Sequence, residues 1–247
     1  ERREHMLGTA DVVVIGGGVM GCAALYYLTR LGVERPLLLE RDTLASGSTG
    51  RSMAILRMHY SNEVTTRMAL ESHRVIANFE DEVGAPGGFV ETGYFFLAGP
   101  GHEEPLRRNV ELGRRLGVDT RALTPDEAAD VMPDCFVLDG VVAAAYEPHS
   151  GYADSSAVTN GFATGARAAG AEVRLGVTVT GISTERGRVS GVETDGGRIE
   201  SGAVVLTAGP WAPEFLSSVG APLPLSWVRH QVVKIRRPLD AVPTLPT

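Results

Sequence analysis

The chain has 247 residues, of which 43% are hydrophobic and 21% charged, with a formal net charge of −7. This composition is typical of a folded globular protein and excludes the disordered and fibrous classes. The acidic balance disfavours nucleic acid as a partner, and no apolar run approaches the ~20 residues of a membrane span. The two cysteines form no CxxC pair and no histidine cluster has metal-ligand spacing, so we expect no metal site and a reducing, cytoplasmic location.

The first elements predict a βαβ unit. Residues 11–15 form a β-branched apolar run typical of a buried parallel strand, and three glycines at 16–18 end it. Residues 19–31 have helical spacing up to Gly32, and residues 37–40 read as a second strand. This order favours a doubly wound parallel sheet.

The middle of the chain alternates loops, helices and strands. Residues 42–62 form a loop rich in small residues, residues 63–83 predict one helix, and the cluster at 84–88 breaks the chain. A strand is expected over 90–97 and a helix over 105–116. Thr124, Pro125 and Glu127 have the spacing of a helix start with a capping box.

The last third predicts more strands than helices. A strand at 141–146 precedes a helix at 155–169, and strands follow at 172–182, 188–194, 198–200 and 203–207. Residues 227–232 also have a strand pattern, which contains Arg229. Residues 1–10 are polar and look like the start of the chain, and the proline-rich end at 238–247 does not look like a finished domain.

One motif in the first unit points to a dinucleotide. Gly16-x-Gly18-x-x-Gly21 follows a strand and opens a helix, which suits a tight turn, a close approach of a pyrophosphate and close packing of helix on strand. The helix N-terminus adds free N–H groups and a partial positive charge. Glu40 ends the next strand, where an acid that binds ribose hydroxyls is expected. The fingerprint alone does not separate NAD from FAD.

The following loop and several later motifs together resemble the D-amino-acid oxidase superfamily of FAD enzymes, in the branch of glycine oxidase, sarcosine oxidase and dimethylglycine dehydrogenase. The matching pieces occur in family order over nearly the whole chain. They are Val14-Ile-Gly-Gly-Gly-Val-Met-Gly21, Glu40-Arg41, Ala45-Ser-Gly-Ser-Thr49, Ile55-Leu-Arg57 with Tyr60, Gly151-Tyr-Ala-Asp154, Gly176-Val-Thr-Val-Thr-Gly-Ile182 and Ala208-Gly-Pro-Trp211.

The expected fold class is therefore α/β, with a Rossmann-like FAD-binding domain and an inserted mixed-sheet (α+β) substrate domain. We expect the FAD-binding domain over 8–85 and 150–215, and the substrate domain over 86–149 and 216–247. Members of the family continue well past this length, so the substrate domain is expected to be incomplete here, and a second chain could supply the remainder.

The resemblance implies roles for particular residues. Glu40 would hold the adenosine ribose, the 46–49 loop would line the pyrophosphate and ribityl chain, and Val179 would pair its backbone with adenine. The full set expected to bind FAD is Gly16, Gly18, Val19, Met20, Gly21, Glu40, Arg41, Ser46, Ser48, Thr49, Arg51, Val179, Ala208 and Gly209.

Two residues are candidates for the chemistry. Arg57 corresponds to a basic position beside the flavin ring in sarcosine oxidases, where a cation would stabilise the reduced, anionic flavin; the alternative is a surface salt bridge. His59 could face the active site or simply be packed or exposed. The main catalytic residues of the family are expected beyond Thr247.

The resemblance implies oxidation of the C–N bond of a small amine or amino acid, such as sarcosine, glycine or a D-amino acid, by hydride transfer to flavin N5. Three alternatives remain open at this point. One is a flavin dehydrogenase of the 2-hydroxy-acid or glycerol-phosphate type. Another is a non-catalytic subunit or fragment that binds a nucleotide or a partner chain. The third is a dehydrogenase that uses only a nicotinamide cofactor.

Overall fold

The computed structural model describes residues 6–133, 136–228 and 231–232. They form two compact units. Unit 1 comprises Glu1–Ser52, Glu80–Gly87 and Ser155–Gln231, and unit 2 comprises Met53–Phe79, Gly88–Asp154 and Val232–Thr247. Residues 53–79 thus group with unit 2, whereas the expected cofactor domain contained them; the function of each domain stays a prediction. The expected α/β class is confirmed.

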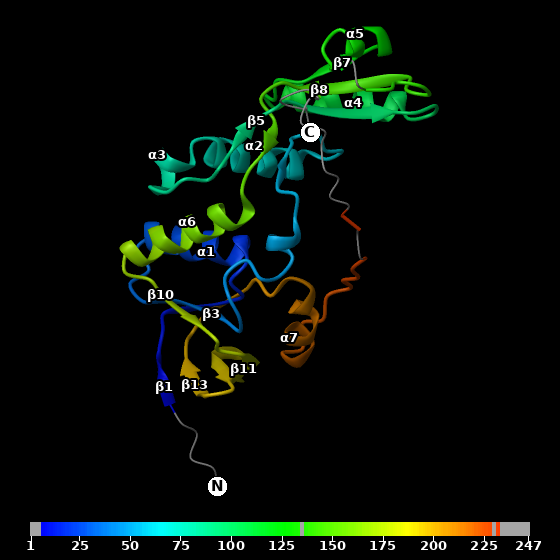
Figure 1. The fold of residues 1–247 in the computed structure, drawn as a ribbon. Helices are drawn as coiled ribbons and strands as arrows, with labels where there is room; N and C mark the ends of the chain where they lie inside the picture. Colours follow the sequence, from blue (N-terminus) through cyan, green and yellow to red (C-terminus); the bar gives the residue numbers. More distant parts are fainter. Residues whose placement is uncertain (1–5, 134–135, 229–230, 233–247) are drawn as a thin grey trace. The chain divides into compact units, whose positions relative to one another are not determined.

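The centre of unit 1 is a parallel sheet in the order β10–β3–β2–β14, formed by Glu172–Leu175, Pro36–Glu40, Val12–Ile15 and Val204–Leu206. All three pairings are parallel, with Val13 opposite both Leu37 and Val204. Helices α1 (Val19–Arg30) and α6 (Ser155–Ala168) pack side by side on one face (Figure 1). The two central strands, β2 and β3, are buried along almost their whole length, because both faces of the sheet are covered.

The other face of this sheet packs on a second sheet in the order β1–β13–β12–β11 (Figure 1). Its strands are Met6–Thr9, Gly197–Glu200, Arg188–Thr194 and Val179–Glu185. The stretch expected only to be a polar start contains β1, which pairs in parallel with β13. The strand expected over 172–182 is two strands, since Gly176 turns the chain with φ 70°. The core between the sheets includes Ile15, Leu37, Leu39, Val192 and Ile199.

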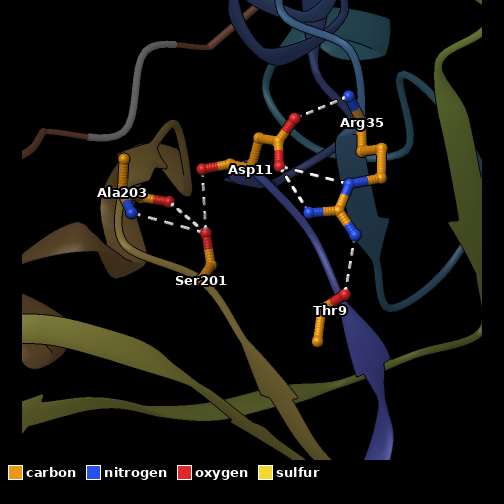
Figure 2. A network of polar contacts seen from close by, with 5 residues as sticks. All are labelled: Thr9, Asp11, Arg35, Ser201 and Ala203. Atoms are coloured by element: carbon orange, nitrogen blue, oxygen red, sulfur yellow. Dashed lines mark hydrogen bonds and ion pairs between the residues drawn. The ribbon is translucent and has the colours of Figure 1, made fainter.

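A network of hydrogen bonds and one ion pair links residues at the ends of these strands (Figure 2). The Arg35 guanidinium donates to Asp11 Oδ1 at 2.7 Å and to Thr9 Oγ1 at 2.9 Å. The Ser201 hydroxyl bonds to the carbonyl oxygens of Asp11 and Ala203. The hydrogen bond from Arg35 lowers the pKa of Asp11. Because the ion pair is solvent-exposed, it contributes to geometry more than to stability.

Unit 2 contains an antiparallel sheet in the order β6–β8–β7, formed by Tyr94–Ala98, Ala143–Glu147 and Arg121–Leu123. Helix α4 (Glu103–Arg115) packs Leu106 and Val110 on the alanines of β6 and β8. Helix α5 (Pro125–Ala129) begins with the predicted capping box. The two strands' alanines suit this interface because small side chains let the helix approach closely.

A smaller sheet, β4–β9–β5, joins Ile55–Leu56, Gly151–Tyr152 and Val90–Glu91. The strand expected over 90–97 is therefore divided between β5 and β6. Helix α2 (Glu63–Ala77) is capped by Asn62, whose side chain accepts from Thr65 N. The single helix expected over 63–83 is also divided, because Asn78 ends α2 with φ −114° and ψ 34° before α3 (Phe79–Val83).

Three short helices complete the described chain: η1 (Thr49–Arg51), η2 (Gly209–Trp211) and α7 (Ala212–Ser218). Residues 227, 228, 231 and 232 belong to no strand, in contrast to the strand expected over 227–232. Arg229 and the proline-rich end lie outside the described residues. Across the described ranges, no helix has both the length and the apolar character needed to cross a membrane.

Candidate cofactor site and the Arg57 cluster

The glycines of the motif are required by close backbone contacts. Gly16 has φ 108°, and a Cβ there would lie 2.7 Å from the Thr207 carbonyl oxygen. A Cβ on Gly21 would lie only 1.9 Å from the Gly16 carbonyl oxygen. A Cβ on Gly18 would lie 3.1 Å from Thr49 Oγ1. A side chain at Gly16 or Gly21 would collide with backbone and push the strand, turn and helix apart, whereas one at Gly18 would only crowd the Thr49 side chain.

The glycine turn places the N-terminus of α1 at the surface of unit 1. Gly18 is the N-cap and gives no side-chain bond, and no acidic residue lies in the first turn. Thr49 Oγ1 accepts from Val19 N at 3.1 Å. The remaining first-turn N–H groups lack intrahelical partners, as at any helix start. The result is a site for an anion such as a pyrophosphate.

Glu40 lies beside this turn at the end of β3. Its Oε2 accepts from Gly17 N at 2.6 Å, and its Oε1 accepts from Asp42 N at 2.9 Å. The loop that follows is fastened to the same turn, because Ala45 N donates to Gly17 O at 2.9 Å. Ala45 has φ 61°, a strained value that places the loop against the glycine turn. Acid, turn and loop therefore share one edge of the parallel sheet.

A cavity of about 260 Å³ opens along this edge. Twelve of the residues expected to bind FAD line it: Gly16, Gly18, Val19, Met20, Glu40, Arg41, Ser46, Ser48, Thr49, Val179, Ala208 and Gly209. The other two do not. Gly21 packs beneath the turn, and the exposed Arg51 side chain donates to the Ser46 carbonyl oxygen at 2.7 Å.

The wall residues that were not in the predicted set include Val177, Thr207, Trp211 and Phe215. The Trp211 ring lies under the Arg41 guanidinium at 4.2 Å. Thr207 Oγ1 donates to the carbonyl oxygens of the strand end before the turn, at 2.8 and 3.1 Å. Phe215 comes from α7, which no periodic pattern signalled. These residues make the cavity wall more apolar than the motif alone indicated.

Arg57 lies in unit 2, directly after β4, and is partly buried. Its guanidinium lies 4.4 Å from the Tyr60 ring and 5.8 Å from the Tyr94 ring, and it donates to the His59 carbonyl oxygen. Burial raises the pKa of Tyr94. Within the described ranges Arg57 forms no ion pair, so its positive charge has no carboxylate bonded to it. We call Arg57, His59, Tyr60 and Tyr94 the Arg57 cluster.

His59 is packed inside unit 2 with 4% of its surface exposed. Its ring stacks on Phe96 at 4.9 Å, and its Nε2 lies 3.3 Å from Asn109 Nδ2. Its Nδ1 has no hydrogen-bond partner among the described residues. Burial, together with the Arg57 charge, lowers the pKa of His59 to about 4. The imidazole is therefore neutral near pH 7 and a weak base.

Comparison with known proteins identifies the family. The chain matches the family described as FAD dependent oxidoreductase over residues 11–247. The chain belongs to this family of FAD-dependent oxidoreductases. The predicted resemblance and the predicted cofactor are therefore confirmed.

Individual relatives agree with this assignment. Human mitochondrial sarcosine dehydrogenase is 34% identical over 245 residues, which cover 96% of this chain and 26% of the relative. The mouse mitochondrial pyruvate dehydrogenase phosphatase regulatory subunit is 33% identical, and the match covers 94% of this chain and 26% of the relative. The crystal structure of L-proline dehydrogenase from P. horikoshii superposes with a TM-score of 0.79 at 31% identity. The superposition covers 86% of this chain and 56% of that structure. The chain thus spans about a quarter of the length of each of these two mitochondrial relatives.

The cavity of this FAD-dependent oxidoreductase fits part of its cofactor. Added Cβ atoms at Gly16 and Gly21 would close the turn, and the first turn of α1 offers N–H groups to phosphate oxygens. Glu40 presents a carboxylate, the group that binds ribose hydroxyls. A volume of about 260 Å³ lies just below the ~300 Å³ of small ligand pockets, which suits a portion of a dinucleotide. The described residues contain no group of three or more side chains able to hold a metal ion.

Proposed function

We propose that the protein of which this chain is a part oxidises the C–N bond of a small amine or amino acid with FAD. The observation that carries this proposal is the glycine-built cavity of unit 1 with Glu40 at its edge, in a chain of this family. The names of two relatives concern sarcosine and L-proline, both of which carry a secondary amine and a carboxylate. They favour an amino acid with a substituted nitrogen.

The residues of this chain would bind and orient. The glycine turn, the N-terminus of α1 and Glu40 would hold the adenosine diphosphate half of the cofactor, and bound FAD supplies the electron-accepting chemistry. Arg57 would offer its positive charge to an anion, either a substrate carboxylate or negative charge that develops on the flavin. His59 would remain neutral and would shape the cluster through Phe96 and Asn109.

A second candidate function is a non-catalytic role. The mouse relative is named as the regulatory subunit of a phosphatase, and it matches almost as much of this chain at nearly the same identity as the human dehydrogenase does. In that role the chain would bind a nucleotide or a partner protein without oxidising a substrate. Flavin reduction by substrate distinguishes the two candidates.

The cellular location is suggested by two observations that differ. The composition favours the cytoplasm, whereas two relatives are named as mitochondrial. Because the chain spans only about a quarter of those relatives, we propose that further sequence, in the same chain or in a second one, completes the substrate site.

The test is the visible spectrum of the full-length protein that contains this chain, recorded anaerobically before and after sarcosine or L-proline is added. We expect flavin absorption that is bleached by one of these amino acids and not by 2-hydroxy acids or glycerol phosphate. Bleaching only by a hydroxy acid would replace the proposed substrate class. A flavin that no substrate reduces would favour the non-catalytic role.

A further inference from the structure

The segment that carries Arg57 has few backbone ties. We call residues 55–60 the Arg57 segment. Its first two residues form β4, in which Leu56 pairs with Gly151 of β9. Residues 57–60 have no regular secondary structure. The next tie is a hydrogen bond from Met58 N to Glu147 Oε2 at 2.8 Å. Arg57 is therefore held from both sides by one stretch of chain, residues 147–151.

Glu147 is an unusual residue to make such a bond. Only 1% of its surface is exposed, at the end of β8 opposite Tyr94. Its Oε2 also accepts from Ser150 Oγ at 2.8 Å, while its Oε1 has no partner in the part of the chain that the structure describes. Burial raises the pKa of this carboxyl. Burying a carboxyl with one unbonded oxygen costs folding free energy. A neutral group that accepts from Met58 N would not carry this cost.

Glu147 lies in the field of Arg57 but does not pair with its guanidinium. Arg57 and His73 both favour its ionised form, and the carboxyl in turn disfavours ionisation of Tyr94. Arg57 and Glu147 nevertheless form no ion pair within 4 Å, since the guanidinium lies over Tyr60 and bonds to the His59 carbonyl oxygen. Glu147 thus bonds to the backbone next to Arg57 and leaves the guanidinium available to another anion.

The other contacts of Arg57 cannot fix its position alone. Tyr60 and the His59 carbonyl belong to the same segment and would move with it. The external supports are the β4–β9 pairing, the Tyr94 ring at 5.8 Å, the bond to Glu147, and the contacts of the His59 ring with Phe96 and Asn109. Of these, the bond to Glu147 is the one next to Arg57 in the chain on its C-terminal side. A binding group must be held to within about 0.5 Å of its productive place.

We propose that Glu147 is the positioning residue that holds the Arg57 segment in place for binding of an anionic substrate group. This inference rests on the proposed function, because it takes Arg57 as the group that meets the substrate. Glu147 itself touches no substrate; it acts through the Met58 backbone. A merely structural role would instead lower the stability of unit 2 without a specific link to Arg57.

The test uses the full-length, FAD-loaded protein and sarcosine as substrate. Glu147→Ala removes the acceptor, and we expect the KM for sarcosine to rise about tenfold, the effect of one lost hydrogen bond. The bound flavin per chain and its spectrum should not change. Glu147→Gln keeps an acceptor for Met58 N and should restore most of the KM. Glu111→Gln, which removes an exposed carboxylate of α4, is the matched control and should behave as wild type.

A double-mutant cycle with Arg57→Met separates positioning from structure. If Glu147 acts through Arg57, Glu147→Ala should change the KM less than about twofold once Arg57 is absent. Equal effects in both backgrounds, or an unchanged KM in Glu147→Ala, would overturn the inference. If Glu147→Ala does not fold, Glu147→Asp takes its place in the cycle, because the shorter side chain withdraws the carboxylate from Met58. A wild-type protein that binds FAD but oxidises no amino acid would instead overturn the proposed function.

Discussion

The cofactor cavity of unit 1 and the Arg57 cluster of unit 2 differ in the groups that form them. The cavity of unit 1 is formed mainly by backbone: a glycine turn, the N-terminus of α1 and a loop bonded to Gly17. The Arg57 cluster of unit 2 is formed by side chains of β6 and of the irregular chain that follows β4. Both are partly buried, yet one depends on the absence of Cβ atoms and the other on particular charged and aromatic groups.

This difference decides which changes each region tolerates. In unit 1 an added methyl group is harmful wherever the backbone makes close contact, whatever its chemistry. In unit 2 a conservative change of charge or hydrogen bonding matters more than volume, because buried polar groups there have few partners. Four predictions use this contrast, from the largest expected effect to the smallest.

The largest effect should come from Gly21→Ala. Its Cβ would lie 1.9 Å from the Gly16 carbonyl oxygen, so the helix must separate from the turn. We expect a loss of unfolding free energy of about 3 kcal/mol or more and loss of bound FAD, measured by urea denaturation and flavin absorbance. Gly47→Ala is the control and should keep both, because Gly47 lies in the cavity wall with open space at its Cβ. Normal flavin content in Gly21→Ala would refute the account of unit 1.

The next effect is the pH dependence that His59 gives to unit 2. Its folded pKa of about 4 lies below its usual 6.5. The neutral ring therefore contributes stability that is present above pH 6.5 and is lost as the pH falls toward 4. We expect this loss to be about 2 kcal/mol, allowing for partial solvent screening, and to disappear in His59→Gln. Urea denaturation between pH 7 and pH 4 measures it. The exposed His102 provides the control, since His102→Gln should retain the wild-type pH dependence.

Glu40→Gln should weaken FAD binding without unfolding unit 1. The amide oxygen can still accept from one of the two backbone N–H groups that the carboxylate binds, but the charge is lost. We expect the Kd for FAD to rise about tenfold, measured by quenching of flavin fluorescence. Glu34→Gln, an exposed change in the turn before β3, should leave the Kd as it is. An unchanged Kd in Glu40→Gln would remove Glu40 from the cofactor site.

The smallest effect concerns Glu147 and pH. Burial raises the folded pKa of its carboxyl, so its stabilising contribution is complete below the unfolded value of ~4.3 and is lost as the pH rises through the folded value. Glu147→Gln cannot ionise. Relative to wild type, the free energy of unfolding of this variant should therefore increase as the pH rises from 4 toward neutrality. The opposite trend would show that the carboxyl is stabilised in its ionised form.

The same contrast explains what could be predicted from the sequence. The glycine turn, α1, β3 and Glu40 lie within 25 residues of one another and follow local spacing rules, so they were predicted. Phe215 and Thr207 join the cavity only through the pairing of β14 with β2, and β1 was missed because it is a four-residue strand that depends on its partner β13.

In unit 2 the important partners are distant in sequence. Glu147 is 89 residues from Met58, and Asn109 is 50 residues from His59. The sheet that brings β8 beside β6, and the helix α4 that covers it, determine these contacts. No spacing rule encodes them. A backbone-built site is visible in a sequence as glycine spacing, whereas a side-chain cluster becomes visible only when the fold is known.

The most direct test of the account is an anaerobic titration of the FAD-loaded, full-length protein with sarcosine, comparing wild type with Arg57→Met. The account predicts that both proteins keep their flavin, because the cofactor is held by unit 1, and that the variant requires a much higher sarcosine concentration for bleaching. An Arg57→Met protein that loses its flavin, or that is bleached at the wild-type sarcosine concentration, would contradict the division of roles between the two regions.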